Sequence, residues 1–171
     1  MKITRTLMLI CAVCLMSIGV AYADYAITQE LTLTDTQNGT LTTGIQGRIG
    51  FDKADISGSM TYSDFHIDIF GMEYGPIQGE IAYTIQWDAA TGYFSLTGNG
   101  QITAIIEGVS YPLTIEDIEI SKADQNAKPV LTGQVIIARF LRLDVSMFPP
   151  GLVERLFFTP FSGVLKLFAG L

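Results

Sequence analysis

The chain has 171 residues, of which 17 are acidic and ten are basic, so its formal net charge at pH 7 is −7. An acidic chain lacks the basic surface that neutralises phosphate groups, and we therefore do not expect nucleic acid among its partners. The length suits a single domain with a hydrophobic core of its own.

The first 23 residues have the three parts of a secretory signal peptide. Lys2 and Arg5 give a positive start, residues 7–20 form an apolar run, and residues 21–23 (Ala-Tyr-Ala) supply the small residues that signal peptidase accepts. We expect cleavage before Asp24 and export to the periplasm or the extracellular space. The alternative is an uncleaved anchor, because the uncharged stretch is just long enough to span a bilayer.

Cleavage would change the chemistry of the chain. Cys11 and Cys14 have the C-x-x-C spacing of redox or metal sites, but both lie inside the apolar run, where cysteine acts as a small hydrophobic residue. The remaining chain, residues 24–171, has 148 residues, no cysteine, and eight basic against 17 acidic residues, a net charge of −9. Its stability must then come from burial of apolar surface rather than from disulfides.

Alternation of apolar and polar residues with a period of two dominates residues 26–145. In residues 77–88, for example, Ile81, Tyr83 and Ile85 fall on one side and Glu80 and Thr84 on the other, as in a strand with one buried face. The same pattern predicts strands over residues 27–33, 41–51, 56–62, 65–70, 77–88, 93–97, 102–106, 109–115, 118–120 and 131–145.

These segments predict an all-β domain over residues 24–145. The phase of the alternation changes after residue 62, which predicts a bulge or a sharp bend near Ser63 and Asp64. Short turn-like clusters, at residues 52–55, 88–92 and 98–100, are typical of hairpins. We expect a single antiparallel meander of about eight to ten strands, arranged as a sandwich or a closed barrel.

The chain changes character in residues 146–171. Pro149 and Pro150 end the last strand, and the spacing of apolar residues predicts short amphipathic helices after Pro150 and after Pro160, with a strand over residues 162–169 as the alternative. Four residues are candidates for an apolar contact surface with a lipid, a membrane or a protein partner: Phe157, Phe158, Phe161 and Phe168. We favour the interpretation that this segment packs on the β-domain and shares its core.

Two polar clusters are weak candidates for metal binding. Asp64, His66 and Asp68 share one side of a predicted strand and could hold a divalent ion, or an aspartate could orient His66 as a base. We favour a solvated polar face, because alternation requires one opposite the apolar residues. The acidic stretch of residues 116–119 lacks a calcium-loop pattern, and we expect a solvated turn there. No cofactor is expected.

The sequence favours a binding role over catalysis. It has a single histidine, no G-x-S-x-G or H-E-x-x-H motif, and no cysteine after residue 23. We expect an exported, non-enzymatic cell-envelope or extracellular protein that binds an apolar, lipid-like ligand, a protein partner or a membrane surface. A small outer-membrane β-barrel is the first alternative, and a hydrolase that uses a carboxylate pair is the second.

Overall fold

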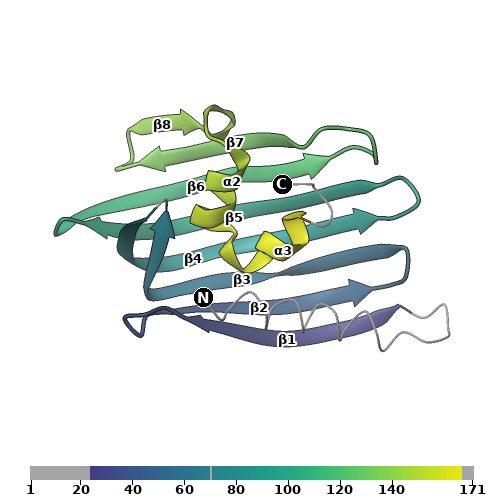
Figure 1. The fold of residues 1–171 in the computed structure, drawn as a ribbon, viewed down its shortest axis with the longest axis horizontal. Helices are drawn as coiled ribbons and strands as arrows, with labels where there is room; N and C mark the ends of the chain where they lie inside the picture. Colours follow the sequence, from purple (N-terminus) through teal and green to yellow (C-terminus); the bar gives the residue numbers. More distant parts are fainter. Residues whose placement is uncertain (1–23, 70, 167–171) are drawn as a thin grey trace.

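The computed structural model describes residues 24–69 and 71–166, in which eight strands form one antiparallel sheet (Figure 1). Each strand pairs with its neighbours in sequence, so that β1 and β8 are the two edges. The strands are β1 (Tyr25–Thr34), β2 (Thr40–Ile49), β3 (Lys53–Ile69), β4 (Met72–Asp88), β5 (Tyr93–Ile106), β6 (Val109–Lys122), β7 (Val130–Ile137) and β8 (Leu141–Asp144). The predicted signal peptide and Phe168 lie outside the described residues.

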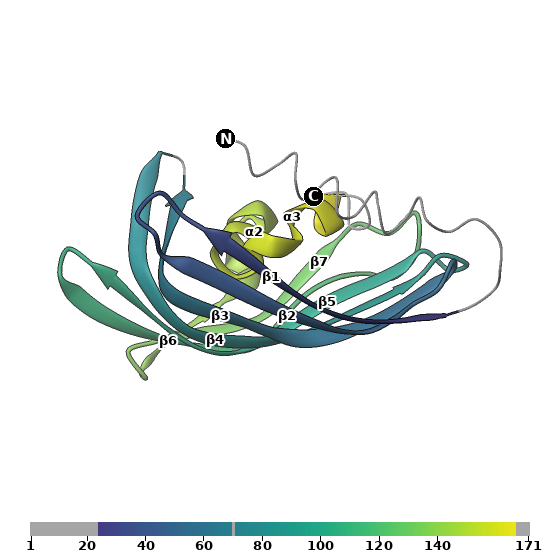
Figure 2. The same ribbon diagram turned by 90° about the horizontal axis from the view of Figure 1, so that it is seen from below.

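The C-terminal segment is helical and lies on the concave side of the curved sheet (Figure 2). It contains η1 (Val145–Met147), α2 (Pro150–Phe157), η2 (Thr159–Phe161) and α3 (Ser162–Val164). Helices therefore follow Pro150 and include Pro160, as predicted, and the alternative strand over residues 162–169 does not form in its described part. None of the described helices has the length and apolar composition needed to cross a membrane.

The predicted all-β meander with short C-terminal helices is confirmed, but the sheet takes neither expected arrangement. It is open, because β1 and β8 remain separate edges instead of closing a barrel, and no second sheet of described residues stacks on it as in a sandwich. The physical reason is that the helical segment covers the concave face that a second sheet, or the far wall of a barrel, would otherwise cover (Figure 2).

The two faces of the sheet differ in polarity. On β4, Ile77, Ile81 and Tyr83 are buried on the concave side, whereas Gln78 and Glu80 are exposed on the convex side. Cross-strand pairing extends this pattern, because pairing partners share a face. The pairs Ile85–Leu96 and Leu96–Ile120 form a continuous apolar row across β4, β5 and β6. Hydroxyl groups from Thr32, Thr42 and Thr61 form a corresponding polar row on the convex face.

Bulges join several of the predicted segments into longer strands. The bulge expected near Ser63 and Asp64 is confirmed: the register between β3 and β4 shifts there, and Asp64 has a φ of 53°. A second bulge lies in β6, where Asp117 has a φ of 48° and its backbone N–H donates to Asn99 Oδ1 at 2.7 Å. The acidic stretch of residues 116–119 is therefore a bulge within a strand, and the predicted solvated turn is wrong.

The turn predicted at residues 98–100 is also wrong. These residues lie inside β5, at the place where the register between β5 and β6 shifts opposite the bulge of β6. Conversely, the single strand predicted over residues 131–145 is a hairpin of β7 and β8. Its turn contains Ala138 and Arg139, which have φ values of 50° and 69°. Alanine and arginine are not typical turn residues, so the sequence pattern did not indicate a turn there.

At Gly98 of β5 a side chain of the helical segment lies directly against the backbone of the sheet. A Cβ atom at this position would lie 2.8 Å from Cε1 and 2.9 Å from Cζ of Phe158, and 3.3 Å from Cγ2 of Ile81. Phe158 is fully buried. The absence of a side chain on Gly98 therefore makes the space that the Phe158 ring occupies.

We predict that Gly98→Ala destabilises the protein by about 1–3 kcal/mol, the usual cost of overpacking a core. The free energy of unfolding in urea measures this effect. Gly44→Ala is the matched control, because a Cβ at Gly44 of β2 would meet nothing within 4 Å. Alanine should be neutral or slightly stabilising there, since it loses less backbone entropy than glycine. Equal stabilities of the two variants would show that Phe158 does not occupy the space at Gly98.

Candidate functional site

The concave face and its helical cover form the main candidate site. We use "cover" for residues 150–165, which run from α2 through η2 and α3. The residues predicted as an apolar contact surface point inward: Phe157, Phe158 and Phe161 are 4%, 0% and 5% exposed. The structure therefore places these three side chains in the core that the cover shares with the sheet, as the favoured interpretation of the sequence expected.

Aromatic side chains of the sheet and the cover pack against each other. The ring centroids of Tyr83 on β4 and Phe161 lie 4.5 Å apart, with the ring planes tilted by 55°. The Tyr83 hydroxyl reaches across Gly58 of β3 and donates to the backbone oxygen of Gly44 at 2.9 Å. Burial raises the pKa of Tyr83 to about 12, so the hydroxyl remains a donor at neutral pH. Tyr83 thus joins three strands beneath the cover.

Two further polar groups lie on the concave face, on the neighbouring strands β2 and β3. The hydroxyl of Tyr62, on β3, donates to the backbone oxygen of Phe157 at 3.2 Å, and burial raises the pKa of Tyr62 far above its usual value of 10.0. Thr43, on β2, is 1% exposed, and its Oγ1 has no hydrogen-bond partner among the described residues. A buried hydroxyl without a partner costs free energy, so Thr43 is a polar position that the present packing leaves unsatisfied.

The cover itself contains one buried charged residue, Glu154. It lies on α2 and is 8% exposed, beside Val153 and Phe157, which are also buried. Burial raises the pKa of Glu154 above its usual value of 4.5, and the positive charges of Lys166 and Arg155 oppose this shift without reversing it. The closed position of the cover therefore favours the protonated, neutral form of this carboxyl group.

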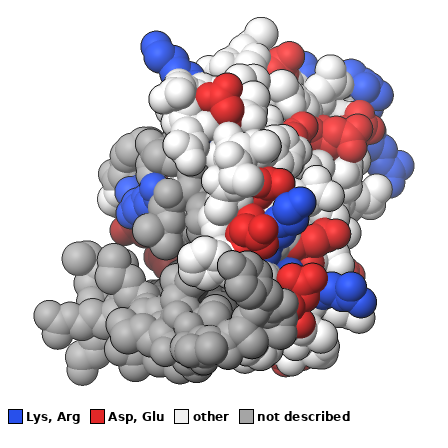
Figure 3. Space-filling view, turned by 90° about the vertical axis from the view of Figure 1, so that its right-hand side faces the viewer, with Lys and Arg blue, Asp and Glu red and all other residues white. Residues whose placement is uncertain are grey.

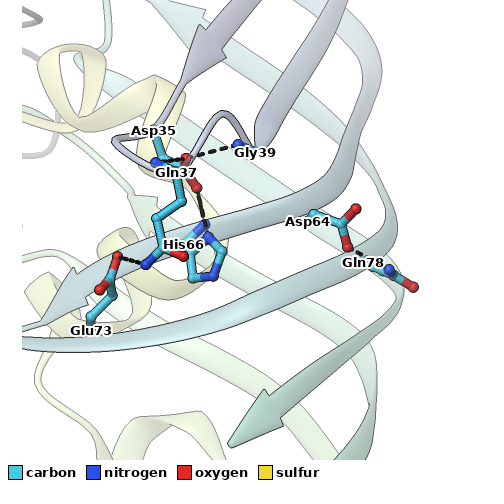
Figure 4. A network of polar contacts seen from close by, with 7 residues as sticks. All are labelled: Asp35, Gln37, Gly39, Asp64, His66, Glu73 and Gln78. Atoms are coloured by element: carbon cyan, nitrogen blue, oxygen red, sulfur yellow. Dashed lines mark hydrogen bonds and ion pairs between the residues drawn. The ribbon is translucent and has the colours of Figure 1, made fainter.

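A second polar site lies where the β1–β2 turn meets the extension of β3 (Figure 4). Asp35 Oδ1 accepts from the backbone N–H groups of Gln37 and Gly39, both at 2.8 Å. Asp35 Oδ2 accepts from the backbone N–H of His66 at 2.6 Å and lies 2.9 Å from His66 Nδ1. A further hydrogen bond, from Gln37 Nε2 to Glu73 Oε1 at 2.9 Å, ties the same turn to β4.

Asp35 holds this turn together as an ionised group. Burial raises the pKa of Asp35, but the hydrogen bonds from His66, Gln37 and Gly39 outweigh burial and bring the pKa below its usual value of 3.8. An ionised carboxylate only accepts hydrogen bonds, so the ring of His66 donates from Nδ1. The arrangement orients the imidazole and attaches the β1–β2 turn to the part of β3 that extends beyond β2.

The three residues predicted as a weak metal site do not converge. Asp64 Oδ1 accepts from Gln78 Nε2 at 2.6 Å, Asp68 Oδ1 accepts from the backbone N–H of Gly71 at 2.8 Å, and His66 faces Asp35. Within the described residues, no group of three or more His, Cys, Asp or Glu side chains is arranged to hold a metal ion. The aspartate that orients His66 is Asp35, 31 residues earlier in the chain.

A partial signal for Asp35 is present in the sequence. The polar residues 35–39 (Asp-Thr-Gln-Asn-Gly) stand between two strands and are typical of a turn closed by an aspartate. No spacing rule, however, connects this turn to His66, because their contact depends on how far β3 runs past β2.

The carboxylates of residues 116–119 do not converge on one site either. Glu116 pairs with Arg142 at 3.4 Å, and Glu119 accepts a hydrogen bond from Ser95 at 2.9 Å.

Two open hollows mark the surface of the sheet. The larger, of about 720 Å³, lies on the convex face and is lined by polar side chains that include Gln78, Gln101 and Arg139. The smaller, of about 330 Å³, lies at the end of the sheet where β2 turns into β3 and includes the ion pair of Lys53 and Asp88 at 3.5 Å. Figure 3 faces this end and shows acidic and basic groups side by side. Such mixed charge is typical of a solvated surface.

Comparison of the chain with protein-family models, with curated proteins and with solved structures finds no match. The concave face and its cover therefore have to be interpreted from their own geometry.

We predict that Asp35→Asn destabilises the protein by about 1–3 kcal/mol, because an amide NH₂ would then face the two N–H groups of His66. Asparagine keeps one oxygen for Gln37 and Gly39. The stabilisation by Asp35 is fully present above the pKa of the unfolded state and is lost as the pH falls through the lower pKa of the folded state. Unfolding experiments at a series of acidic pH values measure both effects.

The control for Asp35→Asn is Gln37→Ala, which removes the exposed contact with Glu73 and should change the stability by less than about 0.5 kcal/mol. The Asp35→Asn protein should also lose less stability on acidification than the unmodified protein does. An identical dependence of stability on pH in the two proteins would contradict the role assigned to Asp35.

Proposed function

We propose that the protein is an exported binding protein whose concave sheet face takes an apolar, lipid-like ligand, and that residues 150–165 are a cover which the ligand displaces. The observation that carries this proposal is the occupancy of the concave face. Val153, Phe157, Phe158, Phe161 and Leu165 of the cover are all at most 5% exposed and lie against the apolar side of the sheet. The cover thus occupies the surface that an acyl chain would contact.

The polar groups of the concave face suit the head of such a ligand. Displacement of the cover frees the Tyr62 hydroxyl from Phe157, and Thr43 Oγ1, on the neighbouring strand, has no partner among the described residues. Two hydroxyl groups on neighbouring strands, surrounded by apolar side chains, match an amphipathic molecule with one or two hydrogen-bonding groups. A purely hydrocarbon ligand would leave both hydroxyls unsatisfied.

The contacts that the ligand has to replace indicate its size. Burial of the five apolar side chains of the cover contributes roughly 8–15 kcal/mol to its closure, at ~1.5–3 kcal/mol for each side chain. A buried methylene group contributes about 0.8 kcal/mol, so about 10 to 19 methylene groups offset the loss of these contacts. The proposed ligand class is therefore the long-chain lipids rather than short fatty acids.

The polarity of the two faces favours this function over the outer-membrane alternative. An outer-membrane barrel turns its apolar side chains outward to lipid and its polar side chains inward. In the described residues the convex, outward face carries hydroxyl and amide groups such as those of Thr32, Thr42 and Gln78, whereas the concave face carries the apolar side chains. This distribution supports an apolar site on the inside of the curve.

We predict that Phe158→Ala loosens the cover and strengthens binding of a fluorescent long-chain fatty acid by about tenfold, since removal of the ring eliminates part of the closing free energy. Titration of the fluorescent probe measures the dissociation constant. Phe51→Ala is the matched control, because Phe51 is 82% exposed in the β2–β3 turn and should leave binding unchanged. Absence of probe binding to both the unmodified protein and a folded Phe158→Ala variant would overturn the proposal.

Glu154→Gln should act in the opposite direction. Because burial raises the pKa of Glu154, ionisation of Glu154 opposes closure as the pH rises above 4.5, and this opposition is complete above the pKa of the folded state. A neutral glutamine removes it, so the variant should be more stable at pH 7 and should bind the probe more weakly. Unchanged stability at pH 7, together with unchanged probe affinity, would show that Glu154 does not regulate the cover.

A further inference from the structure

The first strand of the sheet leaves one edge open. β1 pairs with β2 over all ten of its residues, from Tyr25 to Thr34, and no strand of described residues pairs with its other side. The backbone N–H and C=O groups on that side therefore have no strand partner in the part of the chain that the structure describes. The opposite edge differs, since β8 has four residues and continues directly into η1.

β1 lacks the features that protect edge strands from pairing. Monomeric sheets block their edges with lysine, proline, bulges or very short strands. β1 contains neither lysine nor proline, its register with β2 is unbroken, and Glu30 is its single charged residue. Seven of its ten residues are exposed, among them Gln29 and Glu30, and the other three are only partly buried. The strand is long, regular and nearly uncharged.

We propose that β1 pairs in antiparallel orientation with β1 of a second copy of this chain, about a two-fold axis at Gln29. This register opposes Ile27 to Leu31 of the other copy and Tyr25 to Leu33 on the concave side, where Tyr25 is 48% exposed in the single chain. Such pairs bury apolar surface that the single chain leaves partly in water. The interaction does not depend on the proposed ligand.

The convex side is compatible with the same register. Thr28 then faces Glu30 of the other copy, and Ala26 faces Thr32, so that no two like charges lie directly opposite each other. The two Glu30 side chains become diagonal neighbours at about 7–8 Å, a mild repulsion that salt screens. A register centred on Glu30 itself would oppose two carboxylates. Self-complementarity of β1 about Gln29 is the argument for a second copy as the partner.

The pairing has a defined geometric consequence. The two-fold axis is perpendicular to the sheet, so both concave faces lie on the same side of the assembly. The two sheets then form one continuous sheet in which β1 is no longer an edge. The covers of the two copies remain accessible, because each lies over strands between the two edges of its own sheet (Figure 1). A closed dimer of this kind cannot grow further through β1.

Cysteine substitutions at two positions of β1 test the proposal in the exported protein that begins at Asp24, which has no other cysteine. Under mild oxidation, Gln29→Cys should form a disulfide-linked dimer that reducing agent dissolves, because the two cysteines face each other at the axis. Leu31→Cys is the matched control, since it lies on the same face but two residues from the axis and should cross-link far less. Equal cross-linking of both variants, or cross-linking of Leu31→Cys alone, would overturn the proposed register.

A second measurement does not depend on disulfide geometry. Sedimentation equilibrium should give a dimer for the unmodified protein and a monomer for Gln29→Lys and for Gln29→Glu alone, because each places two like charges at the axis. An equal mixture of the two variants should recover the dimer. Circular dichroism checks that the exposed substitutions leave the fold intact. A monomeric unmodified protein, open-ended oligomers, or dimers of both single variants would each overturn the proposal.

Discussion

The fold depends on a single constraint: one open sheet has an apolar face that has to be covered. The alternation of side chains places Ile81, Tyr83 and Leu96 on the concave side, and burial of such residues is the main stabilising contribution to a cysteine-free domain of this size. The chain meets the constraint with its own C-terminal segment. Phe158 enters the space above Gly98, and Phe161 packs against Tyr83. Removal of the segment would expose the part of the core that Phe158 and Phe161 now cover.

The curvature that makes room for this segment comes from local irregularities in the strands. The bulges at Asp64 and Asp117 bend β3 and β6, and such bends increase the twist of a sheet. The bend of β3 also carries residues 65–69 beyond the start of β2, where the β1–β2 turn lies against them. Asp35 then serves as the partner of the His66 backbone N–H, because the pairing of β3 with β2 ends at Ser63. The polar cluster around His66 is thus a consequence of the bulge.

The sequence predicted those features that follow from periodicity and missed those that depend on contacts between distant segments. Alternation identified which side of β4 is buried, and the change of phase located the bulge at Asp64. The bulge at Asp117 and the turn at Ala138 were missed, because their positive φ angles occur at residues other than glycine. The contact of Asp35 with His66, and the position of the Phe158 ring above Gly98, depend on strand length and curvature, which no local pattern encodes.

Two kinds of unsatisfied surface remain after the sheet has formed, and they require different partners. Apolar surface is non-directional, so helices such as α2 can cover the concave face without matching any strand. The edge of β1 presents rows of N–H and C=O groups that only another extended chain can pair completely. A helical cover cannot form the hydrogen bonds that this edge lacks, because the N–H and C=O groups of a helix already pair within the helix. The protein therefore completes its core within one chain, and the inferred dimer completes its hydrogen bonds.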